Sequence, residues 1–161
     1  MSMRAVIAAV VPRMATKVQD KARPYARVTM SAAYTVPSTG VRVLPFDTAQ
    51  RDDSMMLDAV NFRLVPTIPG LYHVVLCAYS SGTPTGGTLS YHQVAARKNG
   101  DLLLHGVSSI PSASGVHIVT LTHAAIMEMN GSTDYIDACV RTSVGISMGT
   151  VFTVLTAARI G

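Results

Sequence analysis

The sequence predicts an all-β fold, a β-sandwich with an extended N-terminal arm, and three observations support that class. Only 14% of the 161 residues are charged, and Glu128 is the single glutamate, so strong charged helix formers are scarce. Valine and threonine are abundant, and their branched side chains prefer the pleated surface of a strand. Clusters of Gly, Pro, Asn and Ser separate short apolar runs along the chain, as turns separate strands.

The basic residues are concentrated at the N-terminus. Residues 1–27 hold six basic residues against the single acid Asp20, whereas the rest of the chain holds seven basic and eight acidic residues. We expect a basic arm over residues 1–27, which would attract an acidic partner, and one domain over residues 28–161. An ordinary solvated tail is the alternative. The apolar stretch 5–11 is far too short to span a bilayer, so no membrane partner is expected.

Proline and glycine delimit the first strands of the domain. Valine, threonine and tyrosine favour extended runs at 26–36 and 41–46, and the cluster 37–40 (PSTG) turns the chain between them. The polar stretch 47–56 (DTAQRDDSMM) is expected to be a loop. Residues 61–65 then lead into a corner formed by proline and glycine.

The run that follows this corner is the most strand-like in the chain. Pro66 and Pro69 cannot donate to a strand ladder, and Gly70 lets the chain turn tightly. Over residues 70–80 both alternating sets of side chains are mostly apolar, as in a strand that is buried on both faces. We therefore expect another subunit to cover the outward face. A central strand covered by loops is the alternative.

Turn clusters delimit the second half of the chain. The stretch 81–88 (SGTPTGGT) is expected to be a flexible turn, 98–101 (KNGD) a hairpin and 143–150 (SVGISMGT) a loop, because Gly and Asn-Gly accept positive φ. The strands between them are expected at 89–98, 102–107, 116–129, 134–142 and 151–160. Roughly eight to ten strands spaced by turns indicate a sandwich or a jelly roll.

No constellation in the sequence indicates catalysis. No serine stands in a G-x-S-x-G elbow, and no phosphate-binding loop is present. The histidines lack metal-ligand spacing, although three copies of His73 on a symmetry axis are an alternative metal site. An oxygen-rich loop does not match a calcium-binding EF-hand, and its acids are Asp47, Asp52, Asp53 and Asp58. We expect no enzyme, no cofactor and no metal.

Cysteine usage adds no site. Cys77 and Cys139 fall in expected strands, and neither has a CxxC partner. Two buried, reduced thiols are expected, and a disulfide is the alternative.

Five segments, taken in order, resemble the tumour-necrosis-factor/complement-globular-head jelly-roll superfamily, in the version found in structural proteins of bacteriophages and bacteria. The most specific of them is the Gly70-Leu71-Tyr72 corner, and the longer turn in GSTDY departs from the pattern. The resemblance covers roughly residues 41–161. Its segments are VRVLPFDT, NFRLVPTIPGLYHV, VAARKNG, GSTDYIDACV and GTVFTVLTAARIG.

The resemblance implies a homotrimer. In this superfamily the strand after the corner and the final strand face the threefold axis. The interface residues that it implies are His73, Val75, Cys77, Tyr79, Phe152 and Val154. Tyr72 is expected in the core, with its hydroxyl at a polar rim.

The expected function is that of a virion structural protein on the capsid surface, a trimeric decoration or minor capsid protein. Its arm would bind the major capsid protein or another virion protein and stabilise the shell, and the loops 81–88 and 108–115 would be available to a host surface. The arm residues expected to bind are Arg4, Val6, Ile7, Val10, Arg13, Lys17, Lys21 and Arg23.

Three alternatives remain open at this point. The trimer would serve equally as the receptor-binding tip of a phage tail or head fibre. A small shell-forming capsid protein could use the arm to neutralise packaged nucleic acid, although the apolar stretch 5–11 dilutes the charge and disfavours nucleic acid as a partner. A secreted bacterial adhesion module would need a signal peptide, and no clean cleavage site follows the apolar stretch.

Overall fold

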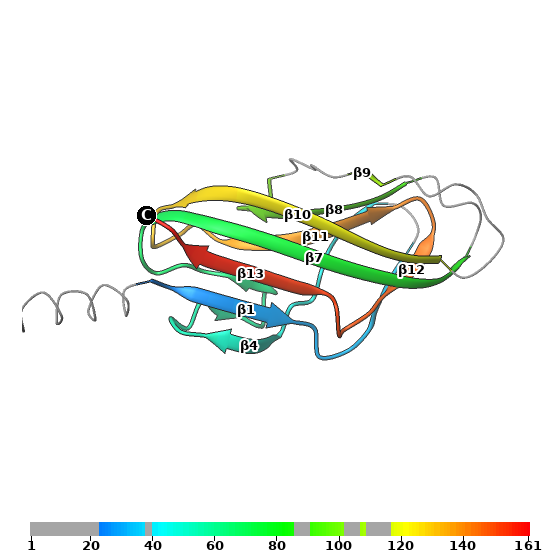
Figure 1. The fold of residues 1–161 in the computed structure, drawn as a ribbon, viewed down its shortest axis with the longest axis horizontal. Coiled ribbons are helices and arrows are strands. Elements are labelled where there is room, and N and C mark those ends of the chain that lie inside the picture. Colours follow the sequence, from blue (N-terminus) through cyan, green and yellow to red (C-terminus); the bar gives the residue numbers. More distant parts are fainter. Residues whose placement is uncertain (1–22, 38–39, 86–90, 102–106, 109–116) are drawn as a thin grey trace, which may run out of the picture.

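A computed structural model of the chain consists of two β-sheets that pack face to face (Figure 1). The structure describes residues 23–37, 40–85, 91–101, 107–108 and 117–161, and within these ranges it has thirteen strands and no helix. The expected all-β sandwich is confirmed. No helix in the described residues is long and apolar enough to cross a membrane. Outside them lie the arm residues before Arg23 and most of the expected strand 102–107 and loop 108–115.

The larger sheet has seven strands in the order β2-β12-β7-β13-β1-β4, with β10 paired to β7. Their bounds are β1 (Tyr25–Thr29), β2 (Tyr34–Val36), β4 (Thr48–Asp52), β7 (Gly70–Thr85), β10 (His117–Met129), β12 (Gly145–Met148) and β13 (Val154–Arg159). The smaller sheet has six strands in the order β5-β6-β11-β8-β9, with β3 paired to β11. Their bounds are β3 (Val41–Val43), β5 (Leu57–Asp58), β6 (Arg63–Leu64), β8 (His92–Lys98), β9 (Val107–Ser108) and β11 (Ile136–Thr142).

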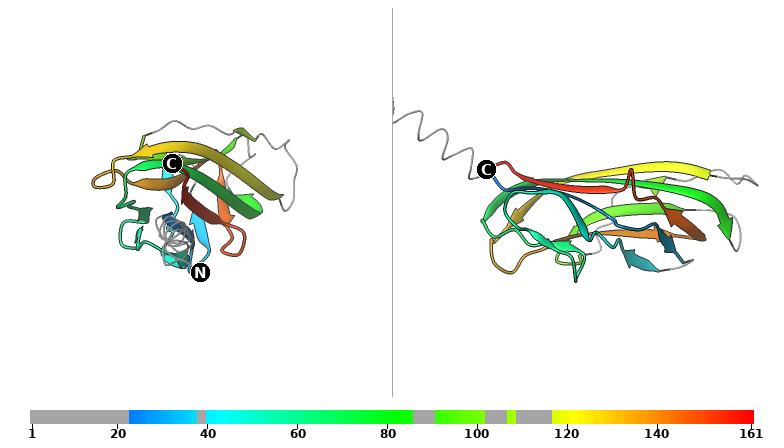
Figure 2. Two further views of the ribbon diagram at one scale, coloured as in Figure 1. Left: turned by 60° about the vertical axis from the view of Figure 1, so that its left-hand side comes forward. Right: turned by 90° about the horizontal axis from the view of Figure 1, so that it is seen from below.

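Strand β7 is the centre of the larger sheet. Along one edge it pairs with β10 from Gly70 to Gly82, and along the other edge it pairs first with β13 and then with β12. All of these pairings are antiparallel and join strands far apart in sequence. Turned on its side, the molecule shows the two sheets one above the other (Figure 2). The side of β7 that faces away from the smaller sheet is therefore an outer surface of the sandwich.

The core lies between the sheets and follows the two-residue period of their strands. Every second residue of β7 from Tyr72 to Ala78 is fully buried, and the alternate residues of β8 and β11 meet them from the other sheet. Burying one large aliphatic or aromatic side chain is worth about 1.5–3 kcal/mol. The largest fully buried side chains include Tyr72, Phe46, Leu44, Met56, Leu64 and Leu76.

The corner before β7 has the structure that its prolines and glycine predict. Gly70 has φ +143°, and a side chain there would meet the carbonyl of Gly161 and lie 2.7 Å from Arg159 Nε. Only glycine fits without strain, because it lacks Cβ. Two residues on, Tyr72 is fully buried, and its hydroxyl donates a hydrogen bond of 2.8 Å to the Ile68 carbonyl. The expected core position of Tyr72 is confirmed.

Three stretches that were expected to be turns or loops form strands. Strand β4 lies in the expected loop 47–56, where it pairs with β1. Strand β12 lies in the expected loop 143–150 and pairs with β2 and β7, and β7 itself continues through Thr85. Such pairings need only backbone groups, so polar and glycine-rich sequence does not prevent them. Strand β1 begins at Tyr25, inside the expected arm, and Ala26 is completely buried, so the sandwich begins before residue 28.

The smaller sheet contains a buried ion pair. Arg97 of β8 and Asp137 of β11 are directly opposite each other. The guanidinium donates two hydrogen bonds to the carboxylate, of 2.7 Å from Nε and 2.6 Å from Nη2. Arg97 Nη1 also donates to the Gly100 carbonyl at 3.3 Å, in the hairpin that follows β8. The pair therefore ties two neighbouring strands and a turn together.

Candidate interaction surface

The outward side of β7 is apolar, and no described segment covers it. Successive residues of a strand point to opposite faces, so every second side chain of β7 points away from the core. Leu71 is 43% exposed, His73 is exposed, and Val75, Cys77 and Tyr79 are half-buried. A sheet face that meets water usually carries polar residues, so this face has the composition of a covered one.

Strand pairing arranges these side chains in rows across the sheet. Val75 lies between Ala124 of β10 and Thr156 of β13, and Arg27 of β1 is next to Thr156 in the same row. The neighbouring rows contain Ile126, His73 and Ala158 on one side and Thr122, Cys77 and Val154 on the other. We call the outward side chains of β10, β7, β13 and β1 the outer face.

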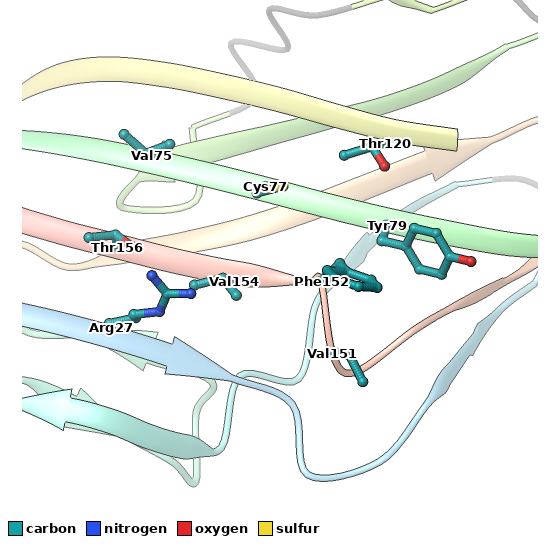
Figure 3. Close-up of a pocket in the computed structure, with 9 residues that line it drawn as sticks. All are labelled: Arg27, Val75, Cys77, Tyr79, Thr120, Val151, Phe152, Val154 and Thr156. Atoms are coloured by element: carbon teal, nitrogen blue, oxygen red, sulfur yellow. The ribbon is translucent and has the colours of Figure 1, made fainter. Parts of the chain in front are cut away.

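A hollow of about 480 Å³ opens on the outer face (Figure 3). Its walls are mostly apolar, and its lining residues are Arg27, Val75, Cys77, Tyr79, Thr120, Val151, Phe152, Val154 and Thr156. The rings of Tyr79 and Phe152 pack edge to face with centroids 5.5 Å apart. Phe152 is 60% exposed and Val151 is 73% exposed. Large apolar side chains therefore stand open to solvent beside a concave surface.

Hydrogen bonds hold the loop that carries Phe152 against the sheet. The next residue, Thr153, accepts a bond from the Tyr79 amide at 3.1 Å and donates one to the Tyr79 carbonyl at 3.2 Å through the same hydroxyl. The Thr29 hydroxyl of β1 donates to the Thr153 carbonyl at 3.1 Å. The loop that carries Phe152 is therefore fixed on the sheet beside the hollow.

Comparisons with known proteins agree with this architecture. No protein-family model and no curated protein matches the sequence, whereas solved structures do match. Murine APRIL at pH 5.0 superposes with a TM-score of 0.60 at 13% identity, over 86% of this chain and 99% of that chain. The globular domain of zebrafish complement 1qA has a TM-score of 0.58 at 13% identity, over 86% and 98%. Eiger TNF from S. frugiperda has a TM-score of 0.52 at 11% identity, over 86% and 92%.

The chain has a TNF-like jelly-roll fold. The resemblance of its ordered sequence segments to this superfamily is confirmed at the level of the fold. In this TNF-like sandwich, β7 is the longest described strand, and it lies at the centre of the sheet that carries the hollow.

The TNF-like fold brings together all six residues that were expected at an interface. Five of them line the hollow, namely Val75, Cys77, Tyr79, Phe152 and Val154. His73 is exposed on the same face, between Ile126 and Ala158. The arm residues expected to bind a partner lie outside the described part of the chain, except for Arg23, which is exposed.

Sequence patterns did not single out the contributions of β10 and β1 to the outer face. Arg27 and Thr120 line the hollow, and Ile126 is 64% exposed at the edge of the face. A signal was present in β10, because its outward positions alternate regularly with half-buried or buried ones. These outward residues are Ile118, Thr120, Thr122, Ala124, Ile126 and Glu128.

The carboxylates that were expected in an acidic loop accept hydrogen bonds within the TNF-like domain. Asp52 accepts hydrogen bonds from the amides of Met56 at 2.9 Å and Leu57 at 2.8 Å. Asp47 accepts one from the Ser31 amide at 2.7 Å, and a second bond from the Ser31 hydroxyl lowers the pKa of Asp47. Over the ranges that the structure describes, no three His, Cys, Asp or Glu side chains are placed to hold a metal ion. Asp52 thus fixes the turn after β4, and Asp47 ties the start of β4 to the segment after β1.

Both cysteines are free thiols, as expected. Cys139 is buried, and its burial raises the pKa of the thiol. Cys77 is only half-buried, because it points outward into the hollow, so the expected burial of both cysteines holds for Cys139 alone.

A buried histidine joins the two sheets near the far end of β7. His92 of β8 is fully buried, and its Nε2 lies 3.3 Å from the Ser80 hydroxyl. Its Nδ1 has no hydrogen-bond partner among the described residues. Burial lowers the pKa of His92 to about 4, because desolvation disfavours the charged imidazolium. The core therefore contains a neutral imidazole at pH 7.

Proposed function

We propose that this chain is a virion structural protein, a homotrimer that decorates the capsid surface, and that the outer face joins its three copies. The observation that carries the proposal is the apolar hollow beside the uncovered outward side of β7. Phe152, Val151 and Ile126 would all stand in water on a lone copy. Large contiguous apolar patches are rare on soluble monomers and mark interaction sites.

A second copy is the occupant that this surface fits best. The hollow is concave, Phe152 projects from its wall, and Ile126 projects elsewhere on the outer face, so one face offers both a pocket and side chains to fill one. Full burial of a single valine, isoleucine or phenylalanine is worth about 1.5–3 kcal/mol, and each copy contributes several. The superfamily resemblance of the sequence, which implies homotrimers, supports a ring of three copies.

The virion role is supported by the sequence. The Pro-Phe-Asp opening, the corner before Tyr72, the Lys-Asn-Gly hairpin and the final strand occur in the order in which the resemblance places them in phage structural proteins. Each trimer would carry three copies of the basic arm, and these arms would attach the trimer to the shell. Repeated weak contacts of this kind gain strength by multivalency.

Replacing Val75 with aspartate should convert the trimer into monomers. Val75 points outward between Ala124 and Thr156, so the core stays intact while each of three contacts receives a charge. Burying an unpaired charge costs several kcal/mol. The molar mass of the wild type and the variant is measured by light scattering after size exclusion.

The matched control is Val60→Asp. Val60 is 86% exposed between β5 and β6 of the smaller sheet, so the same substitution there should leave the mass of three chains unchanged. A wild-type protein with the mass of one chain would contradict the proposal. So would a Val75→Asp variant that remains trimeric.

Electron cryomicroscopy of the virus particle that contains this chain tests its location. We expect knobs of density at threefold positions of the capsid, and we expect them to be absent from particles made without the chain. Deleting residues 1–22 should leave a folded trimer that no longer attaches. Density at the tail or on a fibre would instead support the receptor-binding tip, and particles free of the chain would contradict a virion role.

A further inference from the structure

A closed ring of three identical copies joins two different patches of each copy. Rotation about a threefold axis brings one flank of a subunit against the opposite flank of the next. The outer face has two such flanks. One is β10 and the other is β1, beyond which β4 ends the sheet, and the apolar residues of β7 and β13 lie between the two flanks (Figure 1). The inference below rests on the proposed trimer and concerns what these flanks recognise in each other.

Each flank carries one charged residue. Among the outward side chains of β10, β7, β13 and β1, the described charges are Glu128 on β10 and Arg27 on β1. Arg27 is exposed at the edge of the hollow, and its Nε donates to Gln50 Oε1 at 2.7 Å, a neutral partner. Glu128 is exposed, and no described residue bonds its carboxylate. The two opposite charges thus stand on opposite sides of an apolar strip.

The two charges cannot meet within one copy. Glu128 is opposite Leu71, whereas Arg27 lies in the row of Val75, four residues further along β7. Three strand spacings across the sheet and four residues along it separate them by about 20 Å. A guanidinium and a carboxylate need about 3 Å to bond.

The other described acids are not available to Arg27. Six of them already accept hydrogen bonds within the chain, namely Asp47, Asp52, Asp53, Asp58, Asp134 and Asp137. Asp101 lies in the turn after β8, in the smaller sheet, and so is not on the outer face. Glu128 is therefore the acid that a neighbouring copy can present from this face.

We infer that Glu128 of one copy pairs with Arg27 of the next, and that this ion pair sets the register of the trimer. A charge covered by an apolar neighbour is costly unless an opposite charge meets it. Pairing of the two flanks removes that cost at all three contacts. The pair also disfavours packing of β10 against β10 or of β1 against β1 of the next copy, because equal charges would then face each other.

Charge reversal tests the pair. Arg27→Glu and Glu128→Arg each place like charges at all three contacts, so each single variant should weaken assembly by at least about tenfold in dissociation constant. The double variant Arg27→Glu/Glu128→Arg restores opposite charges and should assemble like the wild type. Sedimentation velocity over a dilution series at low salt and at high salt measures assembly, and the single variants should lose less at high salt, where charges are screened.

A control and the contrary outcomes keep this inference separate from the proposed trimer. Arg42→Glu reverses an exposed charge on β3 of the smaller sheet and should leave assembly unchanged. Both test positions point outward, and unfolding curves of each variant confirm that the sandwich is intact. Single variants that assemble as well as the wild type would contradict the ion pair but not the trimer. So would a double variant that assembles no better than the single variants. A monomeric wild type would overturn the trimer itself.

Discussion

Replacing Asp137 with alanine should lower the free energy of unfolding by about 3–5 kcal/mol. Asp137 is 5% exposed, and its carboxylate accepts two hydrogen bonds from the guanidinium of Arg97, a residue that is 8% exposed. Removing one partner leaves the other charge largely desolvated and unpaired. Urea unfolding measures the change, at one chain concentration for all variants because the stability of an oligomer depends on it.

Two comparison variants separate the buried charge from simple truncation. The double replacement Arg97→Met/Asp137→Leu removes both charges at similar volume and should recover most of the lost stability. Asp53→Ala breaks an ion pair at the surface, in which the side chain of Asp53 is 40% exposed and that of Arg51 is 64% exposed. This variant should change the free energy of unfolding little. An Asp137→Ala protein as stable as the wild type would contradict the expectation, and so would a double variant no more stable than Asp137→Ala.

The sequence predicted the central strand and its two faces because that information is local. Alternation over residues 70–80 places Tyr72 inside and Val75 outside without reference to any other strand. The corner before it is also local, since two prolines and Gly70 restrict the backbone directly. For the same reason, the polar stretches that form β4 and β12 were expected to be loops. Their pairing depends on the edges that other strands leave open.

The rest of the candidate site could not be predicted, because it depends on register between distant strands. Arg27 reaches the row of Val75 only through the pairing of β1 with β13 and of β13 with β7. Arg97 and Asp137 are forty residues apart and become partners only when β8 and β11 align. No residue type or spacing in the sequence states such an alignment. The hollow likewise requires the 149–153 loop to fold back on Tyr79.

Acid should destabilise the protein between pH 6.5 and pH 4 through His92. An imidazole in the unfolded chain takes up a proton near pH 6.5, whereas burial lowers the pKa of His92 in the folded protein to about 4. Between these values the unfolded state binds the additional proton, so the free energy of unfolding falls as the pH falls. Since each tenfold difference in proton affinity is worth about 1.4 kcal/mol, the loss amounts to about 3 kcal/mol and ends near pH 4.

The variant His92→Gln isolates this loss, because glutamine keeps a polar group near Ser80 and does not titrate. The free energy of unfolding of the wild type, minus that of the variant, should decrease steadily from pH 6.5 to pH 4. Below pH 4 this difference should stay constant. Both proteins should lose stability further as the pH falls from about 4 towards 2. There the carboxylate of Asp134 takes up a proton, its pKa being held at about 2 by hydrogen bonds from Lys98 and Asn99. Parallel profiles between pH 6.5 and pH 4, or an NMR titration of His92 centred near pH 6.5, would show that water reaches the imidazole and that this end of the sandwich is open.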